Sequence, residues 1–270
     1  LISVKTYLIF SAKGGSATGG KNYGALYSRE QFTGIFFKNV CLEIHSLPKK
    51  TSRFHLFVWR KAKALVVLTS FIKERLVNLG IDPEKILVAP DAVNLEKFDI
   101  KLSKEEARKK LSLPLDKKLI GYVGMLRTLG MEKGIDIAIK ALSDIKNREI
   151  VLVLVGGYEK DIEFYKNMAK GLGMEDRIIF TGMVGHDLVP AYLKAFDVLI
   201  APFPETEHYK FYMSPLKIFE YMASDRPIIS TQLPSLLEVL TNNSNSILVS
   251  PGSSLDLGKA VIDLLKNYSF

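Results

Sequence analysis

Short apolar runs alternate with stretches of helical pattern along almost the whole chain, and this alternation limits the fold more than any other feature. Continuous apolar strands that alternate with helices are typical of parallel sheets with helices on both faces. The sequence therefore predicts an α/β protein with doubly wound parallel sheets. The predicted strands are Tyr7–Phe10, Val40–Ile44, Ala64–Thr69, Ile86–Ala89, Leu119–Val123, Ile150–Val155, Ile178–Thr181, Val198–Ala201, Ile228–Thr231 and Ile247–Val249. The helical stretches between them include Phe71–Leu79, Gly134–Ile145, Ile162–Leu172 and Leu188–Phe196.

The chain is predicted to divide into two Rossmann-like domains near residue 100. Its 270 residues are enough for two modest domains. Ser103 and Glu106 have the spacing of a capping box for a short charged helix, and a new strand follows soon after. We assign residues 1–100 to an N-terminal domain and residues 101–270 to a C-terminal domain. About 100 residues supply few strand–helix units, so we expect the N-terminal domain to be shortened or incomplete.

The segment 214–238, SPLKIFEYMASDRPIISTQLPSLLE, predicts a helix, a turn and a strand. Ser214 is a good N-cap residue, and Pro215 suits the first helical turn. The residues expected to face the core recur at helical spacing, and they are Leu216, Phe219, Met222 and Ala223. Lys217 and Glu220 lie off that face. The free N–H groups of a helix start can bind an anion, and Glu220 lies roughly 9 Å further along the axis. One helix could thus hold a diphosphate and a ribose; a surface helix with a solvated Glu220 is the alternative.

Two cations flank the loop that follows the predicted strand Leu119–Val123. Arg127 and Lys133 lie there, at the carboxyl end of a strand, which is where open parallel sheets bind ligands. Two such cations can stabilise a diphosphate leaving group. A solvated loop with incidental charge is the alternative interpretation.

Three further residues follow predicted strands. His45 closes Val40–Ile44 and would face the ligand crevice, unless it simply forms a hydrogen bond with a neighbouring carbonyl. Gly182 and Val184 form a turn after Ile178–Thr181. The role of Glu43, two residues before His45, stays open.

These motifs resemble those of GT-B glycosyltransferases, in particular the large retaining family 4. Members of that family often read S-P-L-K-x-F-E-Y-M-A-x-x-x-P-I-I at the donor-binding helix, and the resemblance covers most of residues 38–265. It implies a GT-B fold in which the second Rossmann-like domain holds most of the nucleotide. The donor-binding residues that it implies are Arg127, Lys133, Gly182, Val184, Ser214, Pro215, Leu216 and Glu220.

The resemblance also implies a role for several residues, and the sequence departs from the family pattern at two positions. Glu220 would bind the ribose, His45 would lie beside the donor sugar as the candidate catalytic residue, and Gly14 and Gly15 would belong to a phosphate loop. The family's arginine commonly follows its glycine directly, whereas Arg127 stands three residues after Gly124, so Lys133 is the firmer diphosphate ligand. A glutamate common eight positions before Glu220 is replaced by Tyr212.

Charge and cysteine content narrow the class of protein. The net charge is +8 and the pI about 9.3, but the basic residues are spread along the chain, so we expect no nucleic-acid partner. A single cysteine, Cys41, fits a reducing compartment. No signal peptide is recognised, and no apolar run reaches about 18 residues, so a cytoplasmic protein is expected.

The basic and apolar stretch Lys49–Arg75 could rest on an anionic membrane as a peripheral contact; a core helix with a solvated basic edge is the alternative.

We therefore expect a retaining glycosyltransferase that moves a hexose from a nucleotide sugar to a hydroxyl of a glycan or lipid-linked acceptor. We expect no cofactor and no metal, because Arg127, Lys133 and the start of the 214 helix would do the work of a metal cation, and the chain has no Asp-x-Asp pair. Two alternatives stay open: a nucleotide-sugar epimerase of the same fold, and a non-catalytic nucleotide-binding fragment.

Overall fold

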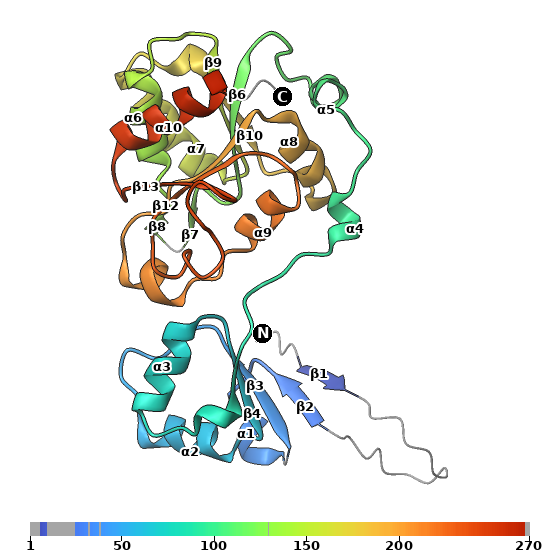
Figure 1. Ribbon diagram of the computed structural model, residues 1–270, viewed down its shortest axis with the longest axis vertical. Coiled ribbons are helices and arrows are strands. Elements are labelled where there is room, and N and C mark those ends of the chain that lie inside the picture. The colour runs from blue at the N-terminus through green and yellow to red at the C-terminus, as the bar shows by residue number, and fades with distance from the viewer. Residues whose placement is uncertain (1–5, 10–24, 32, 38, 129, 268–270) are drawn as a thin grey trace. The chain divides into compact units, whose positions relative to one another are not determined.

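The computed structural model describes residues 6–9, 25–31, 33–37, 39–128 and 130–267 (Figure 1). It contains two compact units. The first comprises the chain up to Asp91 together with Phe211–Ser214, and the second comprises Ala92–Lys210 together with the chain from Pro215 onward. Each unit has its own sheet and its own apolar core.

The first unit is built on a five-stranded sheet of order β1-β2-β3-β4-β5. Its strands are β1 (Thr6–Ile9), β2 (Ala25–Ser28), β3 (Val40–Ile44), β4 (Ala64–Val67) and β5 (Ile86–Val88). β1 pairs antiparallel with β2, and the remaining neighbours are parallel. Helices α1 (Thr33–Phe36), α2 (Arg53–Lys61) and α3 (Ser70–Asn78) pack on the sheet, with Trp59 of α2 and Ile72 of α3 in the core.

The second unit has a six-stranded parallel sheet of order β10-β9-β6-β11-β12-β13. The strands are β6 (Lys118–Val123), β9 (Ile150–Val155), β10 (Ile178–Gly182), β11 (Val198–Ala201), β12 (Ile228–Thr231) and β13 (Ile247–Val249). Numbered along this unit alone, the order is 3-2-1-4-5-6, which is the Rossmann order. The predicted doubly wound α/β architecture is thus confirmed.

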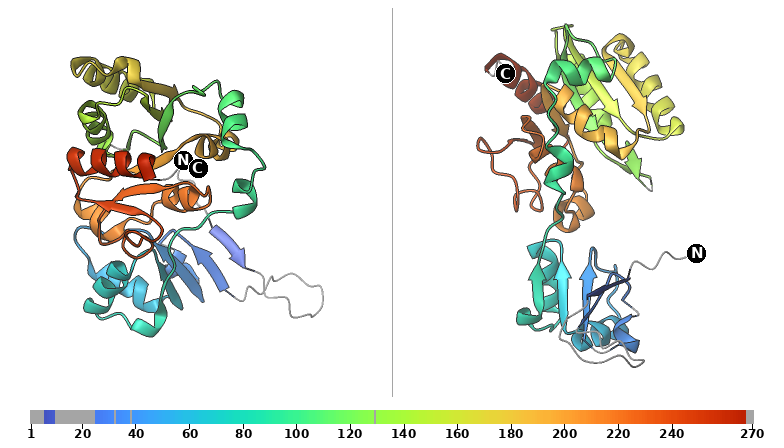
Figure 2. Two further views of the ribbon diagram at one scale, coloured as in Figure 1. Left: turned by 45° about the horizontal axis from the view of Figure 1, so that its top comes forward. Right: turned by 90° about the vertical axis from the view of Figure 1, so that its right-hand side faces the viewer.

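Helices cover both faces of this sheet (Figures 1 and 2). α6 (Ile135–Asp144), α7 (Glu159–Gly171) and α10 (Ser254–Asn267) contribute to one core, and α5 (Lys104–Lys110) packs on α8 (Val189–Ala195). α4 (Leu95–Phe98) and α9 (Leu216–Met222) complete the α-helices of this unit as far as the structure describes it. Every residue of β9 is buried, as expected for a central strand covered on both faces.

A buried ion pair joins α5 to the amino-terminal edge of this sheet. Arg108 Nη2 lies 2.7 Å from Asp197 Oδ2, the same oxygen accepts the Leu119 backbone N–H at 2.7 Å, and Lys104 Nζ lies 2.7 Å from Oδ1. Burial alone would raise the pKa of Asp197, but these donors outweigh it and hold the pKa below its usual value. Breaking such a pair by removing one partner costs about 3–5 kcal/mol.

Several sequence predictions differ from the structure at the start of α9. The N-cap residue is Pro215, and no side chain caps the helix, so the prediction that Ser214 caps it is wrong. The Ser214 hydroxyl instead accepts the Asp91 backbone N–H at 2.8 Å. The helix also ends at Met222, slightly before the predicted end near Ser224.

The buried face of α9 is rotated relative to the prediction. Leu216 and Met222 are 52% and 40% exposed, whereas Tyr221 is fully buried. The Tyr221 hydroxyl accepts the Val123 backbone N–H at 2.9 Å, which ties the helix to the carboxyl end of β6. Because residues four apart share a helix face, this rotation also turns Lys217 inward.

Candidate functional site

The carboxyl ends of β6 and β11 lie at the point where the strand order reverses, where open α/β sheets bind ligands. Gly124 follows β6 with a φ of 132°, a conformation that glycine tolerates and other residues rarely adopt. Gly134, just before α6, packs so closely that a Cβ atom there would lie 1.7 Å from the Pro202 carbonyl oxygen. We call this region the switch-point crevice; the two glycines bring its loops together.

The ammonium group of Lys217 lies beside Gly124 in this region. The residue as a whole is only partly buried, but its Nζ is covered and has no hydrogen-bond partner in the described part of the chain. Nζ lies 3.6 Å from the centre of the Tyr122 ring and 5.3 Å from that of Phe203. Burial lowers the pKa of Lys217 well below its usual value; Lys133 lowers it further and Glu220 opposes the shift. The charged form is therefore unfavourable unless an anion lies beside it.

Lys133 is the second lysine of the crevice. Its Nζ lies 5.0 Å from the centre of the Tyr209 ring, which is itself 5.5 Å from the Phe203 ring. Burial lowers the pKa of Lys133 as well. No ion pair of Lys133 or Lys217 occurs among the residues that the structure describes. One covered amine and one partly buried amine, neither with a counterion among the described residues, make this region suited to an anion.

Arg127, unlike these two lysines, forms an ion pair. It belongs to a small hairpin, β7 (Arg127–Thr128) with β8 (Met131–Glu132), where the sequence predicted a loop. Its Nη2 pairs with Glu132 Oε1 at 2.7 Å, and its guanidinium lies 5.0 Å from the centre of the Phe164 ring. It also lines an open cavity of about 580 Å³, together with Tyr158 and Asp161. Its charge is thus already matched by a carboxylate.

Glu220 lies one turn beyond Lys217 on α9 and is within electrostatic range of it. Its side chain is 14% exposed, and its Oε1 lies 3.4 Å from His186 Nε2. The side chain of His186 is 71% exposed. An ion pair with so exposed a partner leaves the carboxylate able to accept hydrogen bonds from a ligand.

Gly182 and Val184 lie at the end of β10 and in the turn after it. Gly182 has a φ of 71°, and its carbonyl accepts the Gly156 backbone N–H at 2.9 Å. Val184 is partly exposed. These residues would offer mainly backbone groups to a ligand, and their assignment to the donor site stays a prediction.

In the first unit, His45 belongs to a polar cluster on one face of the sheet. Its Nε2 forms a hydrogen bond with Glu43 Oε1, and Arg29 Nη2 lies 2.8 Å from the same oxygen. Burial would raise the pKa of Glu43, but hydrogen bonds from Arg29, Tyr27 and His45 outweigh it and lower the pKa to about 2. The partner of His45 is therefore a carboxylate rather than a neighbouring carbonyl. The Glu-x-His spacing, which puts both side chains on one face of a strand, is the signal that identifies this pair.

The remaining predicted site residues are less informative. Gly14 and Gly15 lie outside the described residues. Pro215 and Leu216 lie at the start of α9, and Leu216 is largely exposed. Their assignment to the donor site, like that of Ser214, stays a prediction.

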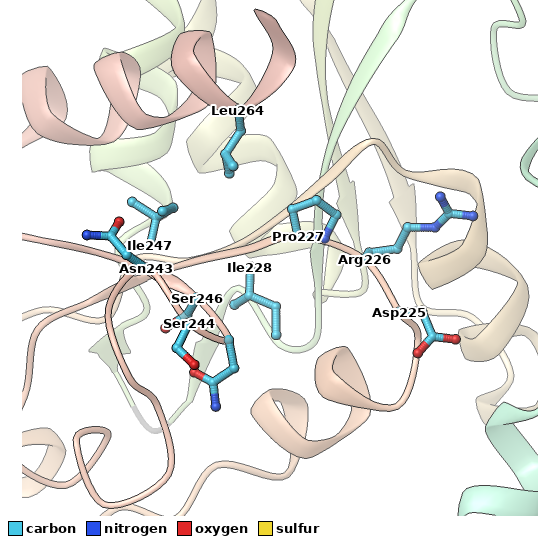
Figure 3. A pocket seen from close by; sticks show the side chains of 10 residues that line it. Asp225, Arg226, Pro227, Ile228, Asn243, Ser244, Ser246, Ile247 and Leu264 are labelled. Atoms are coloured by element: carbon cyan, nitrogen blue, oxygen red, sulfur yellow. The ribbon is translucent and has the colours of Figure 1, made fainter. Parts of the chain in front are cut away.

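A separate cavity of about 300 Å³ lies at the opposite edge of the second sheet (Figure 3). Its lining includes Ile228 and Ile247, which begin β12 and β13, and Leu264 of α10. Figure 3 shows the polar side chains of Asn243 and Ser244 beside it, while Arg226 points away. Because the amino ends of the strands form this edge, the cavity is distinct from the switch-point crevice.

Comparison with known proteins identifies the family. The model of the family described as "Glycosyl transferases group 1" matches residues 117–267, more than half of the chain. The chain belongs to this family. The match covers the six-stranded sheet and all the residues of the switch-point crevice.

Relatives of this glycosyltransferase group 1 protein include an uncharacterized glycosyltransferase of Methanocaldococcus jannaschii, 26% identical over 210 residues, which are 76% of this chain and 52% of that protein. An alpha-monoglucosyldiacylglycerol synthase of Streptococcus pneumoniae is 26% identical over 204 residues, 73% of this chain and 43% of that one. The chain thus spans about half the length of the curated relatives it matches.

Solved structures agree on the fold. HepE of Anabaena, crystallised with UDP and glucose, superposes with a TM-score of 0.73 at 17% identity, covering 91% of this chain and 69% of that one. Such a likeness establishes the fold, and the GT-B glycosyltransferase architecture expected from the sequence is confirmed.

Proposed function

We propose that this chain carries the nucleotide-sugar site of a retaining glycosyltransferase that moves a hexose to a hydroxyl of a glycan or lipid-linked acceptor. The observation that carries the proposal is the presence of a cation and a carboxylate at the switch point. Lys133 lies over the Tyr209 ring with no ion pair in the described part of the chain, and Glu220 on α9 has a side chain that is 14% exposed. A buried cation suits the donor diphosphate, and a carboxylate suits the ribose hydroxyls. The loop of Gly182 and Val184 would then contact the base.

The chemistry needs a stabilised leaving group. The bond from the anomeric carbon to the diphosphate oxygen breaks, and a bond to the acceptor oxygen forms on the same face of the sugar. The acceptor proton passes to the departing diphosphate. A fixed cation in a water-poor crevice stabilises the charge that develops on that diphosphate, so we propose that the reaction requires no metal. In the first unit, we propose that His45, held by Glu43, contacts the sugar or the acceptor.

Named relatives guide the choice of substrates. Anabaena HepE was crystallised with UDP and glucose, so UDP-glucose is the first donor to test. The pneumococcal relative is named for a glycolipid product, which supports a lipid-linked acceptor. No helix in the described part of the chain is both long enough and apolar enough to span a bilayer.

We also propose a peripheral membrane contact through α2. Phe57 is 56% exposed, and it lines an open cavity with Arg53, Arg60 and Lys61. Phe36 of the neighbouring helix α1 is 78% exposed. Exposed aromatic and basic side chains together suit an anionic lipid surface, and co-sedimentation with anionic but not neutral vesicles tests this contact.

A thermal-shift panel tests the proposed function. UDP, GDP, ADP and their glucose conjugates are added in turn, because a ligand that binds the folded state stabilises it by about 2.7 kcal/mol at 100 times its Kd. We expect one base to stabilise the protein, and to support hexose transfer to an acceptor. Conversion of the donor to an epimer without acceptor would favour the epimerase, and binding without any turnover would favour a non-catalytic fragment. If no nucleotide binds, the proposal is wrong.

A further inference from the structure

Lys217 occupies a position where a lysine has a clear energetic cost. An isolated ammonium buried away from water must be paired or must lose its proton. Apolar side chains of similar volume often serve such buried positions as well or better. The surroundings of Nζ are the rings of Tyr122 and Phe203 and the backbone at Gly124, where a Cβ atom would lie 3.2 Å from Nζ. These neighbours offer no anion, so packing alone does not account for the amine.

The amine lies where a ligand would reach it. Gly124 directly follows β6, so Nζ lies at the carboxyl end of the strand beside which the sheet order reverses. Lys133 lies just before α6, and contacts through the Tyr209 and Phe203 rings link its Nζ to that of Lys217. In the described part of the chain, neither amine forms an ion pair with a carboxylate. Their two positive charges match the double negative charge of a diphosphate.

Arg127, the cation that the sequence placed in this role beside Lys133, is engaged elsewhere. Glu132 pairs with its guanidinium at 2.7 Å, and Phe164 stacks against it. Glu132 also accepts a hydrogen bond from the Tyr165 hydroxyl, which fixes this carboxylate in place. Recruiting the Nη2 group of Arg127 to a diphosphate would mean breaking that pair, although its buried Nε has no hydrogen-bond partner. In the part of the chain that the structure describes, the Lys217 ammonium group has no pair to break.

We propose that Lys217 is the second fixed cation of the donor-diphosphate site, beside Lys133 and in place of Arg127. The inference rests on the proposed function, because it assumes that a nucleotide sugar binds at the switch-point crevice. The diphosphate is the counterion that the buried amine lacks, and Lys217 grips it by a charge-assisted hydrogen bond. Burial and Lys133 lower the pKa of Lys217 in the free protein, and a bound diphosphate would raise it again, so proton uptake on binding is expected wherever the free amine is neutral.

Proton uptake by Lys217 would make the affinity for the ligand depend on pH in one direction. Between the lowered pKa of Lys217 in the free protein and its higher pKa in the complex, affinity should fall as pH rises, by up to about tenfold per pH unit for one proton. The other groups facing the amine are Tyr122 on β6, Tyr221 and Glu220 on α9, and Lys133 before α6. Burial raises the pKa of both tyrosines, so they stay neutral in this range. His208, whose pKa is lowered by burial and by Lys133, is a competing proton acceptor that the variants below separate.

The test measures binding by calorimetry with UDP-glucose, GDP-mannose and ADP-glucose, and with the parent nucleosides. Lys217→Met keeps the volume and removes the amine; Lys140→Met, on the exposed surface of α6, is the matched control for loss of one positive charge. We expect Lys217→Met to weaken binding of the nucleotide sugar roughly 10- to 100-fold and to leave nucleoside binding nearly unchanged. The loss of affinity should be larger in Lys217→Met than in Arg127→Met. Lys140→Met should bind like the parent protein.

Calorimetry in buffers of different ionisation enthalpy then counts the protons that the protein takes up when the nucleotide sugar binds. We expect uptake on binding by the parent protein and its loss in Lys217→Met. Unchanged affinity in Lys217→Met, a larger loss in Arg127→Met, or uptake that persists without Lys217 would each overturn the inference. If Lys217→Met does not fold, Lys217→Gln allows the same comparison. Failure of the parent protein to bind any of the three nucleotide sugars would instead reject the proposed function, and this inference with it.

Discussion

Replacing Glu220 by alanine gives a sharp test of how the donor is held. The carboxylate is 14% exposed, and its ion-pair partner His186 is 71% exposed at 3.4 Å. Ion pairs of this exposed kind contribute about 0–1 kcal/mol to stability. The free energy of unfolding should therefore change little, so a loss of binding in Glu220→Ala can be assigned to the site.

The expected loss of affinity follows from the hydrogen bonds to a charged acceptor. Each such bond contributes roughly 1.5–3 kcal/mol, which corresponds to about a 10- to 150-fold rise in Kd. Titration calorimetry with the nucleoside diphosphate chosen by the thermal-shift panel measures this directly. The same titration with the 2′,3′-dideoxy analogue removes the hydroxyls from the ligand instead of the carboxylate from the protein.

The two changes should not add, because they remove the same interaction. Glu220→Ala should weaken binding of the natural nucleotide strongly and that of the dideoxy analogue hardly at all. His186→Ala serves as the comparison variant, since it removes the ion pair and leaves the carboxylate. Equal losses for both ligands, or unchanged affinity for the natural nucleotide, would refute the ribose assignment of Glu220.

Three further outcomes are expected. Lys133→Ala should weaken binding of a nucleoside diphosphate far more than binding of the nucleoside, since its partner is phosphate; equal losses would remove Lys133 from the phosphate site. Chelation by EDTA should leave transfer intact, and activity lost to EDTA and restored by magnesium or manganese would contradict the metal-free proposal. Asp197→Asn should lower the free energy of unfolding by about 3 kcal/mol near neutral pH. Because the folded-state pKa of Asp197 is lowered, this difference should shrink as pH falls through that pKa; chemical denaturation across pH that shows a constant difference would refute the pair's role.

The strands of this protein could be read closely from the sequence. Val40–Ile44, Ile150–Val155 and Ile228–Thr231 have the predicted bounds, because continuous runs of apolar and β-branched residues leave little choice but a buried strand. The strand β2, Ala25–Ser28, was not predicted: ALYS is short and carries little periodic signal. The hairpin of β7 and β8 was missed for the same reason, since two residues per strand set no period.

Side-chain partners were harder to read than strands. Charge and position did not separate Arg127 from Lys133, since both are basic and both lie in one connection after β6; only the spacing typical of the family favoured Lys133. The hairpin separates them, since it pairs Arg127 with Glu132 and leaves Lys133 over the Tyr209 ring. Pairing across a short hairpin depends on register, and neither charge pattern nor propensity specifies the register of two-residue strands.

The same limit explains why Lys217 was placed outside the core. Apolar periodicity treats lysine and tyrosine as surface residues, so the pattern in 214–238 predicted a face led by Leu216 and Met222. The structure orients α9 by a polar contact instead, the hydrogen bond from the Val123 N–H to the Tyr221 hydroxyl. A helix oriented in this way buries the lysine one turn earlier, and a buried amine without a partner is a position where the stability of the fold and the binding of a ligand oppose each other. Disagreement between apolar periodicity and the observed helix face is therefore itself a pointer to the site, and here it points to Lys217.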